Sequence, residues 1–381
     1  MDRTGRSLRV LFFGTYDVRS HPRVQVLMEG FAAHGDAVED INVPLGLDTS
    51  WRVRILQRPW LAPVLVARVL TAWWRLWRAA RRAAVPDAVV VGYLGHFDVH
   101  LARLLWRRTP IALDHLISLS DTAVDRRSSG RRVLRALGAV DAAAVARADV
   151  PVVDTEGHRA LLPAGARDRA AVVAVGAPQR WFHEPSRRRG GDLMRVCFFG
   201  LYTPLQGAPV IGAAIGRLAG GGVPVRFTMV GSGQDLAESR RLAGEGPAEW
   251  RDWVDAGRLP DLVAGHDVCL GIFDTGEKAA RVVPNKVFQG AAAGCAIVTA
   301  DTPVQRAALG DAAVYVPAGS AEALAETLAD LAADPDRVWA LRLAASARAR
   351  DAFRPAVVVE PLRDRLLGHL CSDANARAER R

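Results

Sequence analysis

The chain has 381 residues, of which 50% are hydrophobic and 24% charged, a composition that excludes a disordered or collagen-like protein. Its length allows two or three domains with sizeable cores. The 50 basic and 41 acidic residues give a net charge of +9. This charge favours an anionic partner, such as a phosphate ligand, nucleic acid or an acidic membrane surface, although solvated arginine-rich helices explain the same excess.

The N-terminal segment indicates no export. The apolar run LRVLFF (8–13) is too short for a signal peptide and continues directly into Gly14. No uninterrupted apolar run reaches the roughly 20 residues of a membrane span. We therefore expect a cytoplasmic protein that contacts a membrane, if at all, only at its surface. The cysteines are widely spaced, which predicts reduced and mostly buried thiols rather than a metal site: Cys197, Cys269, Cys295 and Cys371.

Two similar strand-and-turn segments open the two halves of the chain. They are LRVLFFGTYD (8–17) and MRVCFFGLYT (194–203), each followed by a helix-like stretch. A strand that ends in a glycine turn is a common opening of a doubly wound α/β domain. The repeat predicts two such domains of comparable size. Buried parallel strands also share composition by chance, which is the alternative explanation.

The first half alternates between short apolar runs and helical segments, the pattern of a parallel α/β sheet. The predicted strands after the first are 37–43, 88–91, 111–113, 150–153 and 171–175. Clear helical segments between them are 24–33, 99–106 and 131–146.

The helix predicted over Pro63–Arg82 combines tryptophan and arginine. One face gathers apolar side chains, and the arginines lie opposite, a pattern typical of a helix that lies in an anionic membrane interface. A helix packed on the sheet with its arginines in water is the alternative. The apolar face comprises Val66, Val69, Leu70, Trp73, Leu76, Trp77 and Ala80, and the arginines are Arg68, Arg75, Arg78, Arg81 and Arg82.

A polar, glycine-bearing break at SRRRGGDL (186–193) predicts a linker between the domains. The second half then predicts strands at 195–199, 225–230, 267–272, 296–299 and 313–316, and helices at 321–333, 336–352 and 356–369. The predicted organisation is a first Rossmann-like domain at 1–185, a linker at 186–194, a second Rossmann-like domain at 195–355, a helix at 356–370 that packs back on the first domain, and a frayed tail at 371–381.

The stretch 266–302 carries the strongest functional signal. A buried strand is followed by a polar loop and by a helix that begins at Pro284, ends near Gly294 and leads into another strand. The start of a helix offers free N–H groups and a positive dipole end to an anion. Lys278, Arg281 and Lys286 lie in the same loop. The loop therefore predicts a pocket for a phosphorylated ligand, specifically a nucleotide diphosphate attached to a sugar.

Two glycine turns are predicted at the same edge of the sheet. GLYTPLQGAP (200–209) and MVGSGQD (229–235) each follow a predicted strand. Small residues let backbone N–H groups approach an anion, although each turn taken alone is also an ordinary structural turn. Because open α/β sheets bind ligands at the carboxyl ends of their strands, we expect both turns to join the 273–289 loop.

Residues 195–333 resemble the donor-binding domain of GT-B glycosyltransferases, especially the retaining family 4 type. In that family a glycine turn ends in Lys-Gly before a helix, a later strand ends in Gly-x-Gly, and a loop carries two glutamates separated by seven residues. The corresponding stretches are FFGLYTPLQGAP, MVGSGQD and VPNKVFQGAAAGCAIVTAD. The first half resembles the family more loosely, through Gly14, HPR (21–23), GYLGHFDVH (92–100) and LDH (113–115).

Three positions depart from the family pattern. Gln206 stands where the family has its phosphate-binding lysine, and Gln289 stands where it has the ribose-binding glutamate. Arg281 occupies the position of the first glutamate, which leaves Glu277 as the nearby carboxylate. Glutamine both donates to and accepts from ribose hydroxyls, and the three cations of the loop replace the lost phosphate charge.

The resemblance implies a hexosyltransferase-like enzyme (EC 2.4) that is retaining and uses no metal and no cofactor beyond its nucleotide-sugar substrate. Fixed cations and N–H dipoles would stabilise the leaving diphosphate. Asp334 and Asp336 are expected to cap a helix rather than bind metal. The expected donor and phosphate site comprises Gly200, Thr203, Gln206, Gly207, Gly231, Gly233, Lys278, Arg281, Asn285, Lys286 and Gln289. Catalytic candidates are His96, Asp114, His115 and Glu277, with the histidines alternatively plain loop residues.

The expected acceptor side lies in the first turn, with Asp17 alternatively a helix cap: Gly14, Tyr16, Asp17, His21 and Arg23. If the Trp/Arg helix binds membrane, the acceptor is expected to be a cell-envelope glycan or a lipid-linked sugar. Two other functions stay open, a GT-B nucleotide-sugar epimerase and a non-catalytic nucleotide-binding Rossmann protein. Neither glycine turn contains the dinucleotide fingerprint, and no nucleic-acid-binding module is recognisable.

Overall fold

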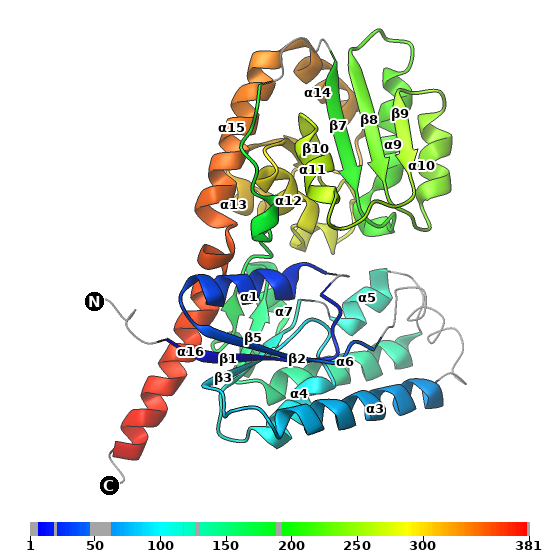
Figure 1. The fold of residues 1–381 in the computed structure, drawn as a ribbon. Helices are drawn as coiled ribbons and strands as arrows, with labels where there is room; N and C mark the ends of the chain where they lie inside the picture. The colour runs from blue at the N-terminus through cyan, green and yellow to red at the C-terminus, as the bar shows by residue number, and fades with distance from the viewer. Residues whose placement is uncertain are drawn as a thin grey trace. The chain divides into compact units, whose positions relative to one another are not determined.

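The computed structural model describes residues 7–18, 21–45, 62–116, 118–125, 130–187 and 193–378. The chain forms two compact units, one of Met1–Ala174 with Val358–Arg381 and one of Val175–Val357 (Figure 1). Each unit is built on a six-stranded parallel sheet with helices between its strands. The predicted fold class, two Rossmann-like α/β domains, is confirmed.

The first unit has the strand order β2-β1-β3-β4-β5-β6, and every pairing is parallel. Its strands are β1 (Arg9–Gly14), β2 (Ala37–Asn42), β3 (Ala88–Val91), β4 (Ile111–Asp114), β5 (Val150–Val153) and β6 (Ala171–Val172). Its helices are α1 (Arg23–Ala33), α3 (Ala62–Ala80), α4 (Asp98–Leu105), α5 (Leu119–Asp125), α6 (Arg131–Arg147), α7 (Glu156–Leu161), α8 (Ala164–Arg167) and most of α16 (Pro355–Ala378).

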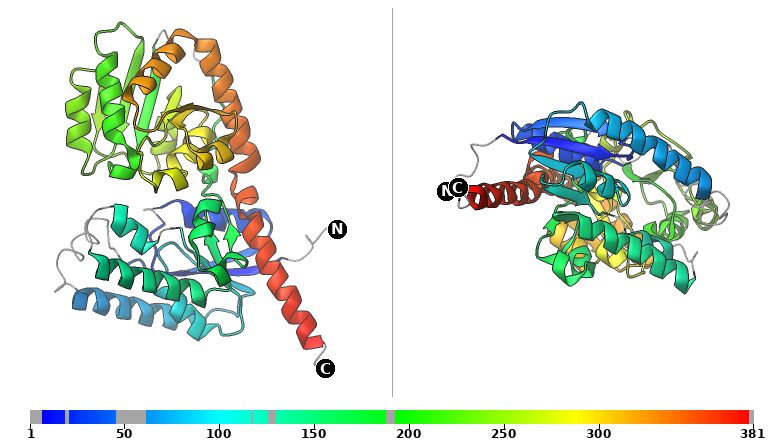
Figure 2. Two further views of the ribbon diagram at one scale, coloured as in Figure 1. Left: turned by 180° about the vertical axis from the view of Figure 1, so that it is seen from behind. Right: turned by 90° about the horizontal axis from the view of Figure 1, so that it is seen from below.

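Helices cover both faces of this sheet (Figures 1 and 2). Because side chains alternate along a strand, Val10 and Phe12 of β1 pack with α1 and α16, and Leu11 and Phe13 pack with α3, α4 and α6. A buried ion pair fastens α16 to this unit, since Arg363 Nε lies 2.8 Å from Asp36 Oδ2. Both faces of the inner strands β1, β3, β4 and β5 are therefore buried, as continuous apolar runs require, whereas the edge strand β2 is largely exposed.

The second unit has the strand order β12-β11-β10-β7-β8-β9. Its strands are β7 (Met194–Phe199), β8 (Val225–Val230), β9 (Ala248–Arg251), β10 (Val268–Leu270), β11 (Ala296–Ala300) and β12 (Ala313–Val316). Its helices are α9 (Ala208–Leu218), α10 (Leu236–Ala243), α11 (Leu259–Ala264), α12 (Asn285–Ala292), α13 (Pro303–Leu309), α14 (Ala321–Ala333) and α15 (Pro335–Ala352), with short 3₁₀ turns η2 (Gln179–Trp181), η3 (Pro204–Gln206) and η4 (Ala279–Arg281).

The boundary of the second unit falls earlier than the predicted linker. Residues 175–187 already pack within this unit: the Ala177 N–H donates to the Phe353 carbonyl, and the His183 N–H donates to the Ala292 carbonyl. Trp181 stacks on Phe199. Residues 188–192 of the expected linker lie outside the described residues. The glycine-rich stretch at 186–193 predicted the linker because of its composition. The backbone hydrogen bonds that place residues 175–187 in the second unit cannot be recognised from composition.

Two local expectations were wrong. The segment 371–378 continues α16, where a frayed tail was expected, because alanine and arginine favour helix. The strand β9 was missed, since AEWR is short and partly polar. By contrast, the capping role of Asp334 is confirmed, because its carboxylate accepts from the Arg337 N–H at 2.9 Å.

Candidate functional site

The loops expected to bind the ligand converge in the second unit at the carboxyl ends of β7, β8 and β10. β7 is the first strand of this sheet, and the chain then builds outward on one side through β8 and β9 and on the other through β10, β11 and β12. The sheet therefore reverses its order between β7 and β10. Open α/β sheets bind ligands at such a switch point, outside the carboxyl ends of their strands.

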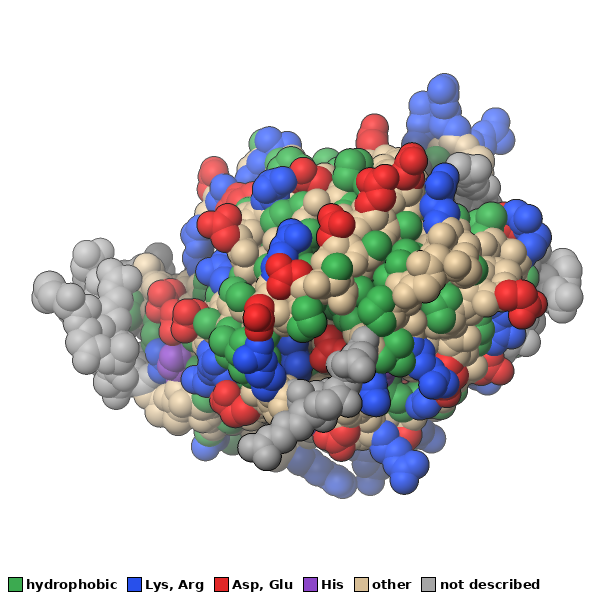
Figure 3. Space-filling model, turned by 90° about the horizontal axis from the view of Figure 1, so that it is seen from above, with side chains coloured by type: hydrophobic (Ala, Val, Ile, Leu, Met, Phe, Trp, Pro, Cys, Tyr) green, Lys and Arg blue, Asp and Glu red, His purple; other side chains and the backbone are tan. Residues whose placement is uncertain are grey.

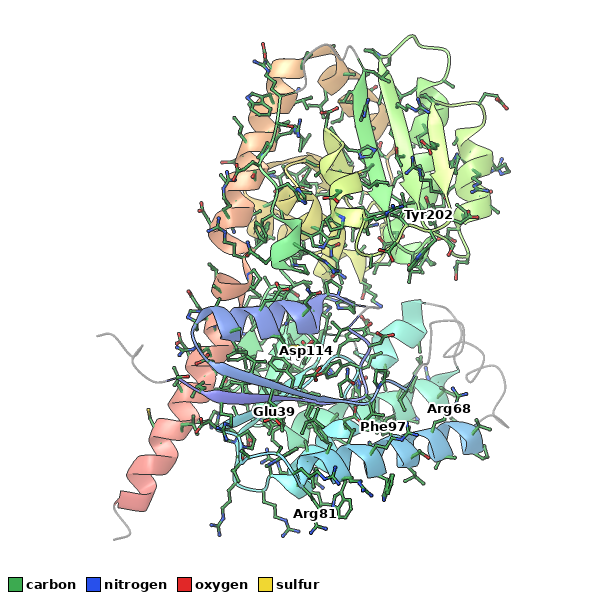
Figure 4. All side chains as sticks on the ribbon, in the orientation of Figure 1. Glu39, Arg68, Arg81, Phe97, Asp114 and Tyr202 are labelled. Carbon is green, nitrogen blue, oxygen red and sulfur yellow. The ribbon has the colours of Figure 1, made fainter. Side chains whose placement is uncertain are left out.

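The glycines at this edge let the turns pack directly on each other. A Cβ at Gly231 would lie 1.9 Å from the carbonyl oxygen of Gly200, so only glycine fits there. Gly207 has φ +62°, and a Cβ there would lie 2.5 Å from the Asp274 amide nitrogen. The Tyr202 N–H donates to the Ser232 carbonyl at 2.9 Å, which joins the two predicted turns, and Tyr202 lies at this edge in Figure 4. The close packing of the two turns therefore explains why Gly207 and Gly231 are glycines, and it holds this edge of the sheet in one conformation.

Lys286, on the first turn of α12, reaches into the β7 turn. Its side chain is 4% exposed, and its Nζ donates to Gln206 Oε1 at 2.5 Å. The Nζ also lies 3.5 Å from the centre of the Phe198 ring, a cation–π contact, and 3.5 Å from the position that a Gly200 Cβ would take. Burial lowers the pKa of Lys286 to about 7. An anion bound beside this amine would favour its protonated form, because it would supply a counter-charge for the ammonium group.

The identity of this cation is itself informative. Lys278 and Lys286 are the only lysines among 381 residues, and every other basic side chain of the 50 is an arginine. An ammonium group shifts its pKa readily when buried, whereas a guanidinium stays charged. The chain therefore places its two titratable cations in one loop of the candidate site.

Gln206 and Lys286 together explain one departure from the family pattern. The lysine expected in the β7 turn is replaced by Gln206, yet the Lys286 amine lies within hydrogen-bond distance of that side chain. The cation is delivered from α12 to the same turn. An amine therefore lies beside this turn, although it comes from a different part of the sequence.

The remaining donor-side candidates line the same loops with different exposure. Gln289 is buried on α12, and Thr203 is half-buried at the start of η3. Arg281 Nη1 lies 3.5 Å from Glu277 Oε2, whose side chain is 94% exposed. Gly233 is exposed at its turn, and Lys278 and Asn285 are half-buried in the loop before α12. Glu277 therefore serves Arg281 at the surface and is not held in a buried catalytic position.

The corresponding edge of the first unit is occupied by a buried ion pair. Arg23 Nε lies 3.1 Å from Asp114 Oδ1, and both side chains are 0% exposed. Arg23 Nη1 also donates to the Val173 carbonyl at 2.8 Å and to that of Ala174. Burial raises the pKa of Asp114, and the guanidinium opposes the rise. Arg23 and Asp114, predicted to meet the acceptor and the reacting sugar, are thus closed off within this unit, with Asp114 lying beneath α1 in Figure 4.

His96 and His115 do come together, on the loops after β3 and β4. Their rings are 5.2 Å apart and edge-on. His96 Nε2 lies 3.1 Å from Asp141 Oδ1, whereas the buried Nδ1 of His115 has no hydrogen-bond partner. Burial, aided by His96, lowers the pKa of His115 to about 4. His115 is therefore a neutral hydrogen-bonding group at pH 7.

His96, His115 and Asp141 are also the residues most able to hold a metal ion in the described part of the chain. One ligand atom from each lies within 4.8 Å of the others. The Asp141 carboxylate, however, already accepts hydrogen bonds from the Leu119 and Ser120 N–H groups at 3.0 and 3.1 Å. It caps the start of α5, so this carboxylate is already engaged by the backbone.

The first turn shows a second closed network. The Tyr16 hydroxyl donates to Asp40 Oδ1 at 2.5 Å, and burial raises its pKa. The Asp98 carboxylate accepts from the Thr15 N–H and hydroxyl, both at 2.8 Å. A Cβ at Gly14 would lie 3.1 Å from that carboxylate. Asp98, which the sequence analysis missed, therefore fixes the turn; its only signal was its place at the start of a helix.

His21 and Asp17 occupy the outer part of this turn. The His21 ring stacks on Tyr93 with 4.4 Å between centroids, and its Nδ1 accepts from the Arg23 N–H. Burial lowers the pKa of His21 to about 3, so the ring is neutral. Asp17 does not cap α1, because the N-cap of that helix is Pro22. Among the acceptor-side candidates, His21 and Asp17 are partly exposed, whereas Tyr16 and Arg23 are buried.

The described cysteines are free thiols. Cys197, Cys269 and Cys295 are buried in the second unit and Cys371 is exposed, as expected for three of the four. No helix in the described ranges has the length and apolarity to cross a bilayer.

Comparison with known proteins supports the fold and identifies the domain. The sequence profile of a family described as glycosyl transferase-like matches residues 213–364. No curated protein sequence matches the chain. Among solved structures, sucrose-phosphate synthase from Thermosynechococcus elongatus is similar with a TM-score of 0.69 at 15% identity, over 98% of this chain and 100% of that one.

Two further structures agree over nearly their whole length. HepE from Anabaena, solved with UDP, gives a TM-score of 0.61 at 14% identity, covering 95% of this chain and 99% of that one. A UDP-forming trehalose-phosphate synthase from Burkholderia vietnamiensis gives 0.62 at 12% identity, covering 95% and 97%. At such identities the similarity establishes the fold. The chain therefore has the two-domain fold of these glycosyltransferases, and its residues 213–364 match a glycosyl transferase-like domain.

Proposed function

We propose that the enzyme transfers a sugar from a nucleotide-diphosphate sugar to an acceptor, with the donor bound by the second unit and the acceptor by the first. The observation that carries this proposal is the buried amine of Lys286, held against the Gly200–Gln206 turn at the switch point of the sheet. A pyrophosphate supplies the counter-charge that this amine lacks among the described residues. Structures of similar fold from Anabaena contain UDP, UDP with glucose and UDP-glucose, which favours a uridine donor.

Cleavage of the sugar–phosphate bond leaves negative charge on the departing diphosphate. A protonated Lys286 and the N–H groups at the start of α12 are rigidly placed to stabilise that charge. Lys286 would supply the stabilisation that the family lysine provides, and Arg281 would add a second cation. Gln289 would bond the ribose hydroxyls, with its amide acting as donor and acceptor.

We further propose that transfer retains the anomeric configuration, as in family 4. A retaining enzyme of this kind needs no carboxylate nucleophile, which accords with Asp114 being neutralised by Arg23 and with Glu277 lying at the surface. His115, neutral and buried with a spare ring nitrogen, is the group we assign to a sugar hydroxyl. Proton NMR of the glycosylated product, formed from donor and acceptor, tests whether the anomeric configuration is retained. A product with the inverted configuration would contradict the proposal.

Catalysis is proposed to need no metal. The fixed cation at the pyrophosphate is an amine, and the Asp141 carboxylate beside the two histidines already accepts from two backbone N–H groups. Dialysis against a chelator, followed by elemental analysis and assay, provides the test. Turnover that depends on an added divalent ion would refute the metal-free mechanism.

The decisive experiment separates transfer from its two alternatives. Nucleoside diphosphates and nucleotide sugars are screened by thermal shift, and the best donor is then incubated alone and with candidate lipid-linked or cell-envelope glycan acceptors. A transferase releases nucleoside diphosphate in step with glycosylated acceptor. An epimerised sugar formed from donor alone would identify an epimerase. Binding without turnover across the acceptors would identify a nucleotide-binding protein.

A cytoplasmic enzyme with an envelope acceptor would work at the inner face of the cell membrane. We include such peripheral association in the proposal, and its structural basis is the outer surface of α3.

A further inference from the structure

Helix α3 presents three distinct faces, where the sequence predicted two. One face is buried: Ala72, Leu76 and Ala80 pack into the core of the first unit. The Trp73 indole N–H donates to Asp98 Oδ1 at 2.9 Å. This bond ties the helix to the same carboxylate that fixes the Gly14–Thr15 turn. The helix is therefore a fixed part of the fold.

A second face is apolar but exposed. Val66, Leu70, Trp74 and Trp77 follow one another at spacings of four, four and three residues, which places them on one stripe of a helix. Their exposed fractions are 55%, 58%, 56% and 39%. The sequence analysis grouped Val66, Leu70 and Trp77 with Leu76 and Ala80 on one apolar face. The structure divides that face, because Leu76 and Ala80 enter the core and the other three stay exposed. We name Val66, Leu70, Trp74 and Trp77 the α3 stripe.

The third face is basic and borders the α3 stripe. Arg78 lies over the Trp74 ring at 5.7 Å, and Arg81 lies over the Trp77 ring at 4.9 Å. No acidic residue occurs between Pro63 and Arg82, whereas acidic and basic side chains are interspersed on the face drawn in Figure 3. Arg68 and Arg81 extend from opposite ends of the helix in Figure 4. An aromatic stripe is thus edged by one sign of charge along its length.

We propose that the α3 stripe docks this enzyme on a bilayer that contains anionic lipids, with α3 lying in the plane of the interface. Tryptophan sits at the level of the headgroups, and arginines beside it pair with lipid phosphates. The anchoring of Trp73 and Leu76 in the core gives the stripe a fixed orientation, so docking requires no unfolding. The absence of acidic residues on α3 favours a lipid surface over a protein partner, whose interface would mix charges.

The test uses the full chain and sedimentation with vesicles of phosphatidylcholine, with and without phosphatidylglycerol. Wild-type protein is expected to bind the anionic vesicles at low salt and to dissociate as salt screens the arginines. Trp74→Ala/Trp77→Ala and Arg75→Glu/Arg78→Glu should each lower the partition coefficient by about tenfold or more. Failure of wild-type protein to bind anionic vesicles at low salt would overturn the proposal.

Matched controls come from the second unit. Trp253 is 79% exposed and outside any stripe, so Trp253→Ala should leave binding unchanged. Arg217→Glu/Arg258→Glu alters the net charge as much as the α3 pair does, and both side chains are exposed. Equal loss in this charge control would show that net charge alone drives binding, and would overturn the role of α3.

A protein partner predicts a different result. If the α3 stripe joined two copies of the chain, light scattering would show a dimer that the Trp74→Ala/Trp77→Ala variant abolishes, without vesicle binding. Nucleotide binding, measured by thermal shift on the same variants, should stay at the wild-type level. That readout separates failure of the docking proposal from failure of the donor site, because the α3 stripe and Lys286 lie in different units.

Discussion

The two sheets of this enzyme share a topology but treat charge at their carboxyl edges in opposite ways. In the first unit, Arg23 and Asp114 neutralise each other in full burial, and the Val173 and Ala174 carbonyls accept from Arg23 Nη1. In the second, the buried Lys286 amine has only a neutral amide and an aromatic ring as its partners among the described residues. The charges at the first edge are paired with each other, whereas the amine at the second edge has no carboxylate partner among the described residues.

In a protein with two similar domains, the presence or absence of an internal counter-ion distinguishes buried charges with a structural role from those available to a ligand. A buried charge with an internal counter-ion stabilises one arrangement, and removing either partner is costly. A buried amine without a counter-ion is destabilising in the free protein, so it persists where a ligand repays the desolvation. The predictions below follow this contrast from the largest expected effect to the smallest.

The first prediction concerns the closed edge. Asp114→Asn leaves Arg23 buried without its counter-charge and should lower the free energy of unfolding by about 3–5 kcal/mol. Urea denaturation followed by circular dichroism measures the loss. The exposed Arg306–Asp301 pair provides the control, because water already solvates both groups and Asp301→Asn should therefore have a much smaller effect. Similar losses for both substitutions would remove the distinction between the two edges.

The second prediction concerns the open edge. Lys286→Ala should weaken binding of a nucleoside diphosphate by about 1–3 kcal/mol, the free energy of a lost charged hydrogen bond. Lys286→Met, which keeps most of the side-chain volume, should lose the same affinity without a packing defect. Lys278→Ala serves as the matched lysine control and should have a smaller effect. Unchanged affinity in both Lys286 variants, measured by calorimetry, would count against its role.

The third prediction is a pH dependence. Since the pKa of Lys286 is lowered to about 7, the amine is charged below pH 7 and neutral above it. Affinity for a nucleotide sugar should therefore fall as pH rises through 7, by up to about tenfold per pH unit. A nucleotide sugar is the right probe, because its diphosphate does not titrate in this range. The Lys286→Met variant should show a flat profile; a slope as steep as that of the wild type would place the titration elsewhere.

The smallest expected effect is that of Gln289→Glu. If Gln289 bonds ribose, the carboxylate restores the family residue, and affinity should change by less than about 1.5 kcal/mol, with altered preference among donors. Competition between uridine, guanosine and adenosine diphosphate sugars measures the preference. Global unfolding of the variant would show instead that Gln289 is a packing residue of α12.

Much of the fold could be predicted because its signals are local. The repeated FFG turn marks the start of each sheet, and the strands at 88–91, 150–153, 225–230 and 313–316 end where the apolar runs end. The short, partly polar β9 escaped because its place is set by pairing with β8. The boundary between the two units at 174/175 was not predicted for a similar reason. The backbone hydrogen bonds that hold residues 175–187 in the second unit have no pattern in the sequence.

The site was less predictable than the fold, because charge partners are set in three dimensions. The loop with Lys286 was identified from its cations and its helix start, yet the contact with Gln206 joins residues 80 positions apart. Arg23 and Asp114 looked available for a substrate in the sequence, and 91 positions separate them. Asp98 and Asp141 carry no motif, and only their hydrogen bonds to Thr15 and Leu119 reveal what they do.

The most direct test of the donor site observes the lysine itself. With ¹⁵N-lysine labelling, NMR of the side-chain amines should contain signals from two residues only, Lys278 and Lys286, which Lys278→Arg assigns. Titration of the free protein should give Lys286 a pKa near 7, and saturating nucleotide sugar should raise that value clearly. A Lys286 amine that titrates like a solvated lysine, or that ignores the nucleotide sugar, would contradict the account.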